Sequence, residues 1–264
     1  MVFQGKGCKT FLKNSIRLIQ VIILICSLEP AMADSLQDQY KFPCVIDSKF
    51  QGDDKILSEI KYETAGKFIK RYLQDAALTE LYTSLSCISD AISLDPEKAK
   101  YWVVLGQVHS QMAAHKVPMA NANAIQAYEQ ALELDPTDTA VMILLGVKLI
   151  QTSQYEDALE YFETALKKTP YLTTYDTIQW MNVAYLAGSQ TKQGTLFYEQ
   201  MVKQNPELLY LYIFKAILHQ AHFDFPQAQK DLLKVISNAN TKKETKEIAQ
   251  KLFQKIKTRK AKND

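Results

Sequence analysis

The sequence predicts an all-α protein built from a stack of helical hairpins. A phrase that ends in proline recurs along the chain, with its prolines 40, 34 and 36 residues apart. Between the prolines, apolar residues follow three- and four-residue steps, the spacing of amphipathic helices. Neither Asn-Gly nor Asp-Gly, the dipeptides typical of β-hairpins, occurs in the chain.

The recurring phrase marks the end of the second helix of each hairpin. Its four copies are Ala91–Pro96, Ala131–Pro136, Ala165–Pro170 and Met201–Pro206. Proline ends a helix because its ring clashes with the preceding turn and it has no N–H to donate. A period of this length indicates units that stack on their neighbours, since one hairpin alone cannot bury its apolar face.

The clearest copy spans residues 139–170. Gly146 lies in its first helix, where the absence of a side chain lets a second helix approach closely. Ala158, Phe162 and Ala165 follow at four- and three-residue steps and share one face of that second helix. This pattern resembles the tetratricopeptide repeat (TPR) family, in which each repeat is a helix, a tight turn and a second helix. The resemblance implies a TPR α-solenoid of about four to five repeats.

The preceding copy is longer. Gly106 and Ala124 are 18 residues apart, whereas Gly146 and Ala158 are 12 apart. The six extra residues lie around 113–121, and we expect them to lengthen the turn between the two helices.

The resemblance covers roughly residues 65–240. We expect a leader at 1–33, an N-terminal extension at 34–64 and a basic capping helix and tail at 241–264. The last segment has nine basic and three acidic residues. It lacks the interleaved aromatic residues and glycines of nucleic-acid-binding segments, so no nucleic-acid partner is predicted. Its apolar stripe is typical of a helix that caps the last repeat: Ile248, Leu252, Phe253 and Ile256.

The leader has the layout of a secretory signal peptide. Four basic residues precede the apolar run Leu18–Leu28, and Ala31-Met32-Ala33 forms a small-residue cleavage pattern. That run is shorter than the ~20 residues that span a bilayer. We therefore expect export to the periplasm or the exterior with cleavage after Ala33. Retention of the leader as an N-terminal membrane anchor is the alternative.

After such cleavage, Cys44 and Cys87 are the remaining cysteines. In an oxidising compartment two remaining cysteines are often paired, and a bridge would attach the extension to the first repeat. Alternatively, Cys87 is a buried thiol and Cys44 is free.

No catalytic, cofactor or metal site is predicted. The chain has neither a glycine-rich phosphate loop nor a Gly-x-Ser-x-Gly elbow. His219 and His222 share a helix face, and a metal-dependent enzyme that uses them is the alternative from another functional class. However, no glutamate follows His219 and no third ligand lies nearby in the sequence.

The resemblance implies a binding surface, because first helices of successive repeats line a concave groove in this family. Members that grip a C-terminal carboxylate place Lys, Arg and Asn there, whereas this chain has Ile143, Val147, Ile213 and Ile217. The groove candidates are Val103, Gln107, Ile143, Val147, Ile150, Gln179, Val183, Leu186, Tyr210, Ile213 and Ile217. An alternative role for these residues is packing between repeats.

The sequence thus predicts a non-enzymatic scaffold that binds a protein partner, as a helix or an extended peptide, in an apolar groove outside the cytoplasm. The chain's own N-terminal segment or a second copy would also cover such a groove. The alternative function is a membrane-anchored subunit of an envelope assembly, including complexes of the cytochrome c maturation type.

Overall fold

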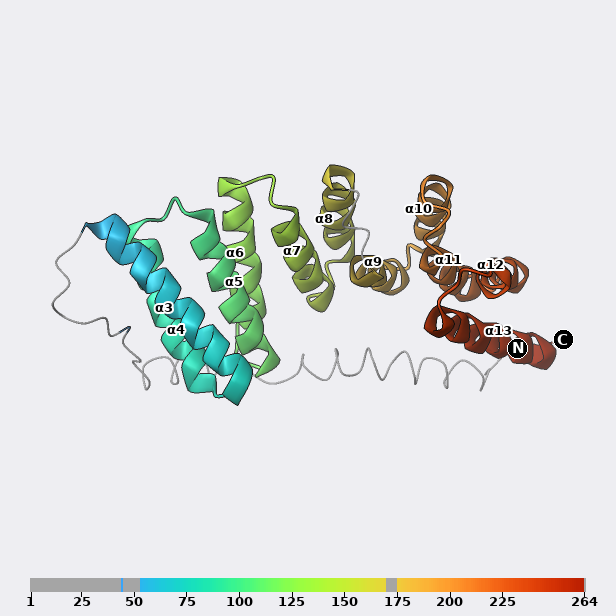
Figure 1. The fold of residues 1–264 in the computed structure, drawn as a ribbon, viewed down its shortest axis with the longest axis horizontal. Helices are drawn as coiled ribbons and strands as arrows, with labels where there is room; N and C mark the ends of the chain where they lie inside the picture. The colour runs from blue at the N-terminus through green and yellow to red at the C-terminus, as the bar shows by residue number, and fades with distance from the viewer. Residues whose placement is uncertain (1–43, 45–52, 170–174, 264) are drawn as a thin grey trace, which may run out of the picture. The chain divides into compact units, whose positions relative to one another are not determined.

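The computed structural model describes residues 44, 53–169 and 175–263. These residues contain eleven helices and no strand, which confirms the predicted all-α class (Figure 1). The helices are α3 (Asp54–Asp75), α4 (Leu78–Leu94), α5 (Ala99–Ala114), α6 (Ala120–Leu134), α7 (Thr139–Gln151), α8 (Tyr155–Lys168), α9 (Tyr175–Ala187), α10 (Thr191–Gln204), α11 (Tyr210–Ala221), α12 (Phe225–Ser237) and α13 (Lys243–Asn263). The predicted leader lies outside the described residues.

The helices begin and end where local chemistry favours it. The Asp138 carboxylate caps α7 by accepting hydrogen bonds from the backbone N–H groups of Ala140 and Val141, at 2.9 and 3.1 Å. Glu156 and Asp157 open α8, where negative charge offsets the helix dipole. At the other end, α8 stops at Lys168, shortly before the proline of the recurring phrase.

Each of the five hairpin turns contains a non-glycine residue in the left-handed region. In the α7–α8 turn, Ser153 has φ 65°. There the backbone N–H of Gln154 donates to the Leu149 carbonyl at 2.8 Å, which closes the turn. The equivalent residues of the other turns are Ala76, Lys116, Ser189 and Phe223.

The insertion in the second hairpin lengthens the turn, as expected, but most of the extra residues extend the helices. Compared with α7 and α8, the extra residues add three positions to α5, two to the turn and one to α6. The segment that ends with Ala113 and Ala114 is rich in helix formers, and α5 therefore continues through it.

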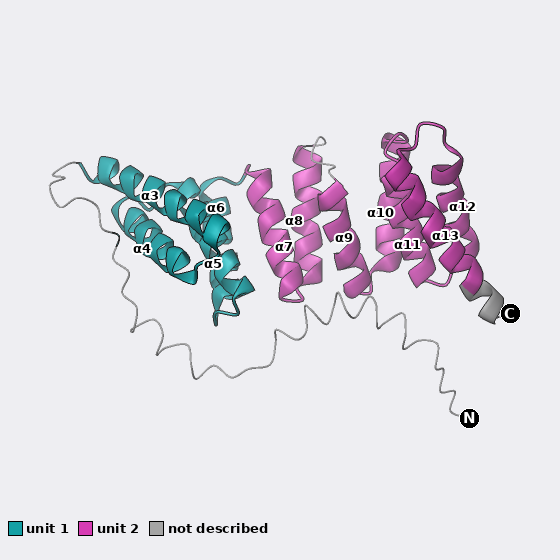
Figure 2. Ribbon diagram, turned by 60° about the horizontal axis from the view of Figure 1, so that its bottom comes forward, with its two compact units in different colours: residues 1–136 teal, residues 137–264 magenta. Residues whose placement is uncertain are grey.

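The chain divides into two compact units, residues 1–136 and 137–264 (Figure 2). In unit 1, α3 packs against α4, α4 against α5, and α5 against α6. The Asp53 side chain caps α3 by accepting a hydrogen bond from the Lys55 N–H at 3.2 Å.

A disulfide joins Cys44 to Cys87, with Cα atoms 4.8 Å apart. Of the two arrangements that the sequence leaves open, the structure contains the bridged one. Cys87 is buried in a core cluster with Ala65, Ile88 and Tyr101, and Cys44 packs against that cluster. The bridge therefore attaches a residue from before α3 to the centre of unit 1.

Replacing both cysteines with alanine is expected to lower the free energy of unfolding by about 3–4 kcal/mol, because the bridge restricts the unfolded chain over 43 residues. Urea unfolding with and without a reductant measures this effect. The reductant should not affect the alanine variant. Equal midpoints for the oxidised and reduced wild-type protein would contradict this role of the bridge.

Unit 2 contains α7 to α13. Within it, α7 packs against α8, α11 against α10 and α12, and α9 contacts α7, α8, α10 and α11. Helix α13 packs against α12, as expected of a capping helix, and its residues Ala249 and Ile256 are buried. Of the other residues in the predicted stripe, Leu252 and Phe253 are half-buried and Ile248 is exposed. None of the helices in the described residues is both long and apolar enough to span a membrane.

Candidate protein-binding face

Three first helices of unit 2, α7, α9 and α11, form a row in which α9 contacts both neighbours. Each carries predicted groove residues at positions that recur every three or four residues, so these share one side of their helix. We call the accessible members of this set the first-helix face. It consists of Ile143, Val147, Gln179, Val183, Leu186, Tyr210 and Ile217.

The first-helix face is mainly apolar and partly accessible. Gln179 is exposed and Leu186 is 36% exposed, while the other five residues are half-buried. None of the seven carries a charge. Half-buried aliphatic side chains lose more water contact when a partner covers them, which favours association. In unit 1, the candidates Val103 and Gln107 lie on α5, half-buried and exposed respectively.

Two of the predicted groove residues are buried. Ile150 is 2% exposed and Ile213 is 3% exposed, so neither side chain is available to a partner in this structure. Both pack inside unit 2. The spacing of residues within one helix shows which of them share a side of that helix. It does not show which of them a neighbouring helix buries.

The start of α9 is held by aromatic contacts with α11. The Tyr175 ring lies 5.8 Å from the Tyr210 ring and 5.3 Å from the Phe214 ring, measured between centroids. Offset and edge-on contacts of this kind stabilise helix packing. They fix two of the three helices of the first-helix face against each other.

Lys148, the neighbour of Val147, is buried rather than presented to solvent. Its Nζ donates a hydrogen bond to Gln151 Oε1 at 2.9 Å. Burial lowers the pKa of Lys148 to about 8. This arrangement is unlike a clamp for a carboxylate, which needs an accessible cation.

The two histidines of the metal hypothesis have different partners. His219 Nδ1 lies 3.5 Å from Asp224 Oδ2, and its Nε2 lies 3.7 Å from Asp231 Oδ2. His222 Nε2 instead shares a hydrogen bond with the Thr191 hydroxyl. Within the described parts of the chain, no group of three or more His, Cys, Asp or Glu is arranged to hold a metal ion.

Sequence reasoning missed a buried ion pair in the α11–α12 hairpin. Lys215 Nζ lies 3.1 Å from Asp231 Oδ1, and Asp231 is only 3% exposed. Burial raises the pKa of Asp231, while Lys215 and His219 oppose the rise. The sequence carries one sign of this ion pair. Lys215 immediately precedes the small residue Ala216, whereas the equivalent position before Gly146 is occupied by the apolar residue Leu145.

A model of the tetratricopeptide repeat family matches residues 120–171, which include α6, α7 and α8. Residues 120–171 therefore match a tetratricopeptide repeat. The paired helices of this repeat explain why Gly146 faces Phe162: a Cβ on this glycine would lie 2.8 Å from Phe162 Cζ. The match covers the end of one hairpin and the whole of the next.

Solved structures with TPR folds resemble the chain. MamA from Desulfovibrio magneticus RS-1, residues 41 to the end, has 15% identity and a TM-score of 0.53, covering 71% of this chain and 96% of its own. A crystal structure of MamA protein has 15% identity and a TM-score of 0.56, covering 74% and 94%. YrrB, described as a TPR protein with an unusual peptide-binding site, has 17% identity and a TM-score of 0.50, covering 76% and 98%.

At this level of identity, the likeness to the solved repeats establishes the fold alone. Comparison with curated protein sequences returned no match. A proposal about function therefore rests on the side chains of the first-helix face.

Proposed function

We propose that this chain is a non-enzymatic scaffold that binds a partner protein through its first-helix face. The observation that carries the proposal is the set of uncharged, mostly aliphatic side chains left partly accessible on three neighbouring helices. An amphipathic helix or an extended apolar peptide is the ligand that suits such a face, because apolar anchors supply the binding free energy. The fold likeness to YrrB, which is described as having a peptide-binding site, is consistent with this role.

We also propose that the scaffold works outside the cytoplasm, in the periplasm or beyond. Its signal-like leader supports this location, and so does the Cys44–Cys87 disulfide, because such bridges persist mainly in oxidising compartments. The intact mass of the protein recovered from its native host measures whether residues 1–33 are removed.

Introducing charge into the first-helix face is expected to reduce partner capture about tenfold or more, because a carboxylate would have to be desolvated against the partner's apolar anchors. Leu186→Glu and Val183→Glu are suitable variants, since both side chains have access to solvent. Capture is measured by crosslinked pull-down from the native envelope, with circular dichroism to check that the helices remain.

Leu196→Glu is the matched control. Leu196 lies on the second helix α10 and is 61% exposed, so the same charge there should leave capture unchanged. Full capture by the Leu186 and Val183 variants, with normal helicity, would rule out the first-helix face as the binding surface.

A further inference from the structure

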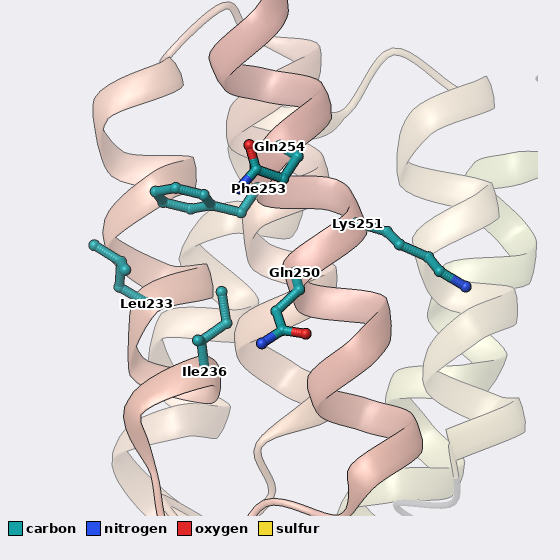
Figure 3. Close-up of a pocket in the computed structure, with 6 residues that line it drawn as sticks. All are labelled: Leu233, Ile236, Gln250, Lys251, Phe253 and Gln254. Carbon is teal, nitrogen blue, oxygen red and sulfur yellow. The ribbon is translucent and has the colours of Figure 1, made fainter.

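An open groove lies between α12 and α13, in the last hairpin and capping helix of unit 2. Its volume is about 650 Å³, and Leu233 and Ile236 of α12 face Gln250, Phe253 and Gln254 of α13 across it. Figure 3 shows Leu233 beside Phe253 and Ile236 beside Gln250, so the two helices run in opposite directions. Lys251 also borders the groove, but its side chain points away from the other five.

The groove leaves apolar side chains without cover. Leu233 is 48% exposed, and Ile236 and Phe253 are half-buried. On α13, Phe253 lies four residues after buried Ala249 and three before buried Ile256, so it shares their side of the helix and stands at the edge of the contact with α12. The groove therefore follows the open edge of this contact, where Leu233 remains available to a further helix.

The shape of the groove favours a helix. Two antiparallel helices leave a furrow along their axes, and ridges of a third helix pack into such furrows. On the α12 wall the apolar lining, Leu233 and Ile236, spans about one turn, and on the α13 wall it is Phe253, between Gln250 and Gln254. The α12 spacing matches anchors three or four residues apart on an incoming helix. A flat bilayer surface would not fill a furrow between two helices.

The charges around the groove identify the kind of helix. Lys230 lies three residues before Leu233, and Lys257 lies four residues after Phe253, so both lie toward the same end of the groove. Both side chains are exposed, and no ion pair among the described residues involves either. From Ile248 to Thr258, every charged residue of α13 is basic. The complementary ligand carries acidic residues beside its apolar anchors.

We propose that the α12–α13 groove binds an acidic amphipathic helix of a partner protein. Its apolar anchors pack against Leu233, Ile236 and Phe253, while its carboxylates approach Lys230 and Lys257. This contact is independent of the first-helix face, because it uses different helices.

A synthetic peptide with the sequence of residues 155–168 provides a defined probe. In the structure this segment is α8, whose buried side includes Leu159 and Phe162 and whose exposed side includes Glu156 and Glu160. A labelled copy is titrated with the full chain, and binding is followed by fluorescence anisotropy. We expect saturable binding that weakens at least tenfold in Leu233→Glu and in the double variant Lys230→Glu/Lys257→Glu. Leu196→Glu, the control on α10, should bind as the wild type does.

Four outcomes overturn the proposal. The first is the absence of saturable binding, and the second is equal binding to Leu233→Glu. The third is equal binding of a peptide in which lysine replaces each acidic residue. The fourth is Leu233-dependent self-association, measured by sedimentation, or Leu233-dependent binding to phosphatidylglycerol vesicles, in place of peptide binding. Self-association would assign the groove to a second copy, and vesicle binding would assign it to a membrane.

Discussion

Replacing Lys215 with alanine is expected to lower the free energy of unfolding by about 3 kcal/mol, because the change leaves the buried Asp231 carboxylate without its cation. The Lys215 Nζ and Asp231 Oδ1 atoms are 3.1 Å apart, and the Asp231 side chain is almost fully enclosed. The His219 Nε2 atom lies 3.7 Å from Asp231 Oδ2. Urea unfolding followed by circular dichroism measures the loss.

The pH dependence of this loss separates a charge effect from lost packing. Burial raises the pKa of Asp231, and removing Lys215 raises that pKa further. An acid whose pKa is higher in the folded state than in the unfolded state destabilises the fold when ionised, and this cost falls as the pH drops through the folded pKa. The Lys215→Ala variant should therefore lose less stability at pH 5 than at pH 7.5.

A double variant supplies the control. Lys215→Met combined with Asp231→Leu removes both charges and keeps apolar volume, so its stability should lie near that of the wild type. A loss in Lys215→Ala that is the same at both pH values, or that the second substitution does not reverse, would show that the ion pair is not the cause.

Replacing Phe162 with alanine is expected to cost about 3–5 kcal/mol, because it leaves a cavity between α7 and α8. Phe162 is fully buried. Its ring lies over Gly146, where a Cβ would come within 2.8 Å of Cζ. The free energy of unfolding, measured in urea, gives the magnitude.

The same contact predicts a specific coupling. Gly146→Ala should destabilise the wild type, because the added methyl overlaps the Phe162 ring and the packed core does not relax freely. In the Phe162→Ala background the methyl has room, and alanine favours the helix by about 1 kcal/mol over glycine. Additive effects of the two substitutions would contradict the close packing of these helices.

Sequence alone was sufficient for the repeats, because their signals are local. The proline of each phrase and the apolar steps before it act within one or two turns, so the ends of the second helices were predicted closely. The insertion near Ala113 was harder. Helix-forming residues in a predicted turn are also compatible with a longer helix. Packing between α5 and α6 decides whether the segment forms a turn or extends the helix.

The candidate binding face was harder to predict than the helices. Its positions follow from helical phase, but the burial of Ile150 and Ile213 depends on how neighbouring helices pack, which a single segment does not encode. The Lys215–Asp231 pair joins two helices of one hairpin across 16 residues of sequence. Only the deviation of Lys215 from the apolar repeat pattern pointed to it.

Site-specific photocrosslinking tests the proposed scaffold most directly. A photoreactive residue at Val183 lies on the first-helix face, whereas one at Leu196 lies on the exposed side of α10. In the native envelope, the Val183 position should crosslink to a distinct partner protein and the Leu196 position should not. Crosslinks that form only at Leu196, or equally at both positions, would contradict binding through the first-helix face.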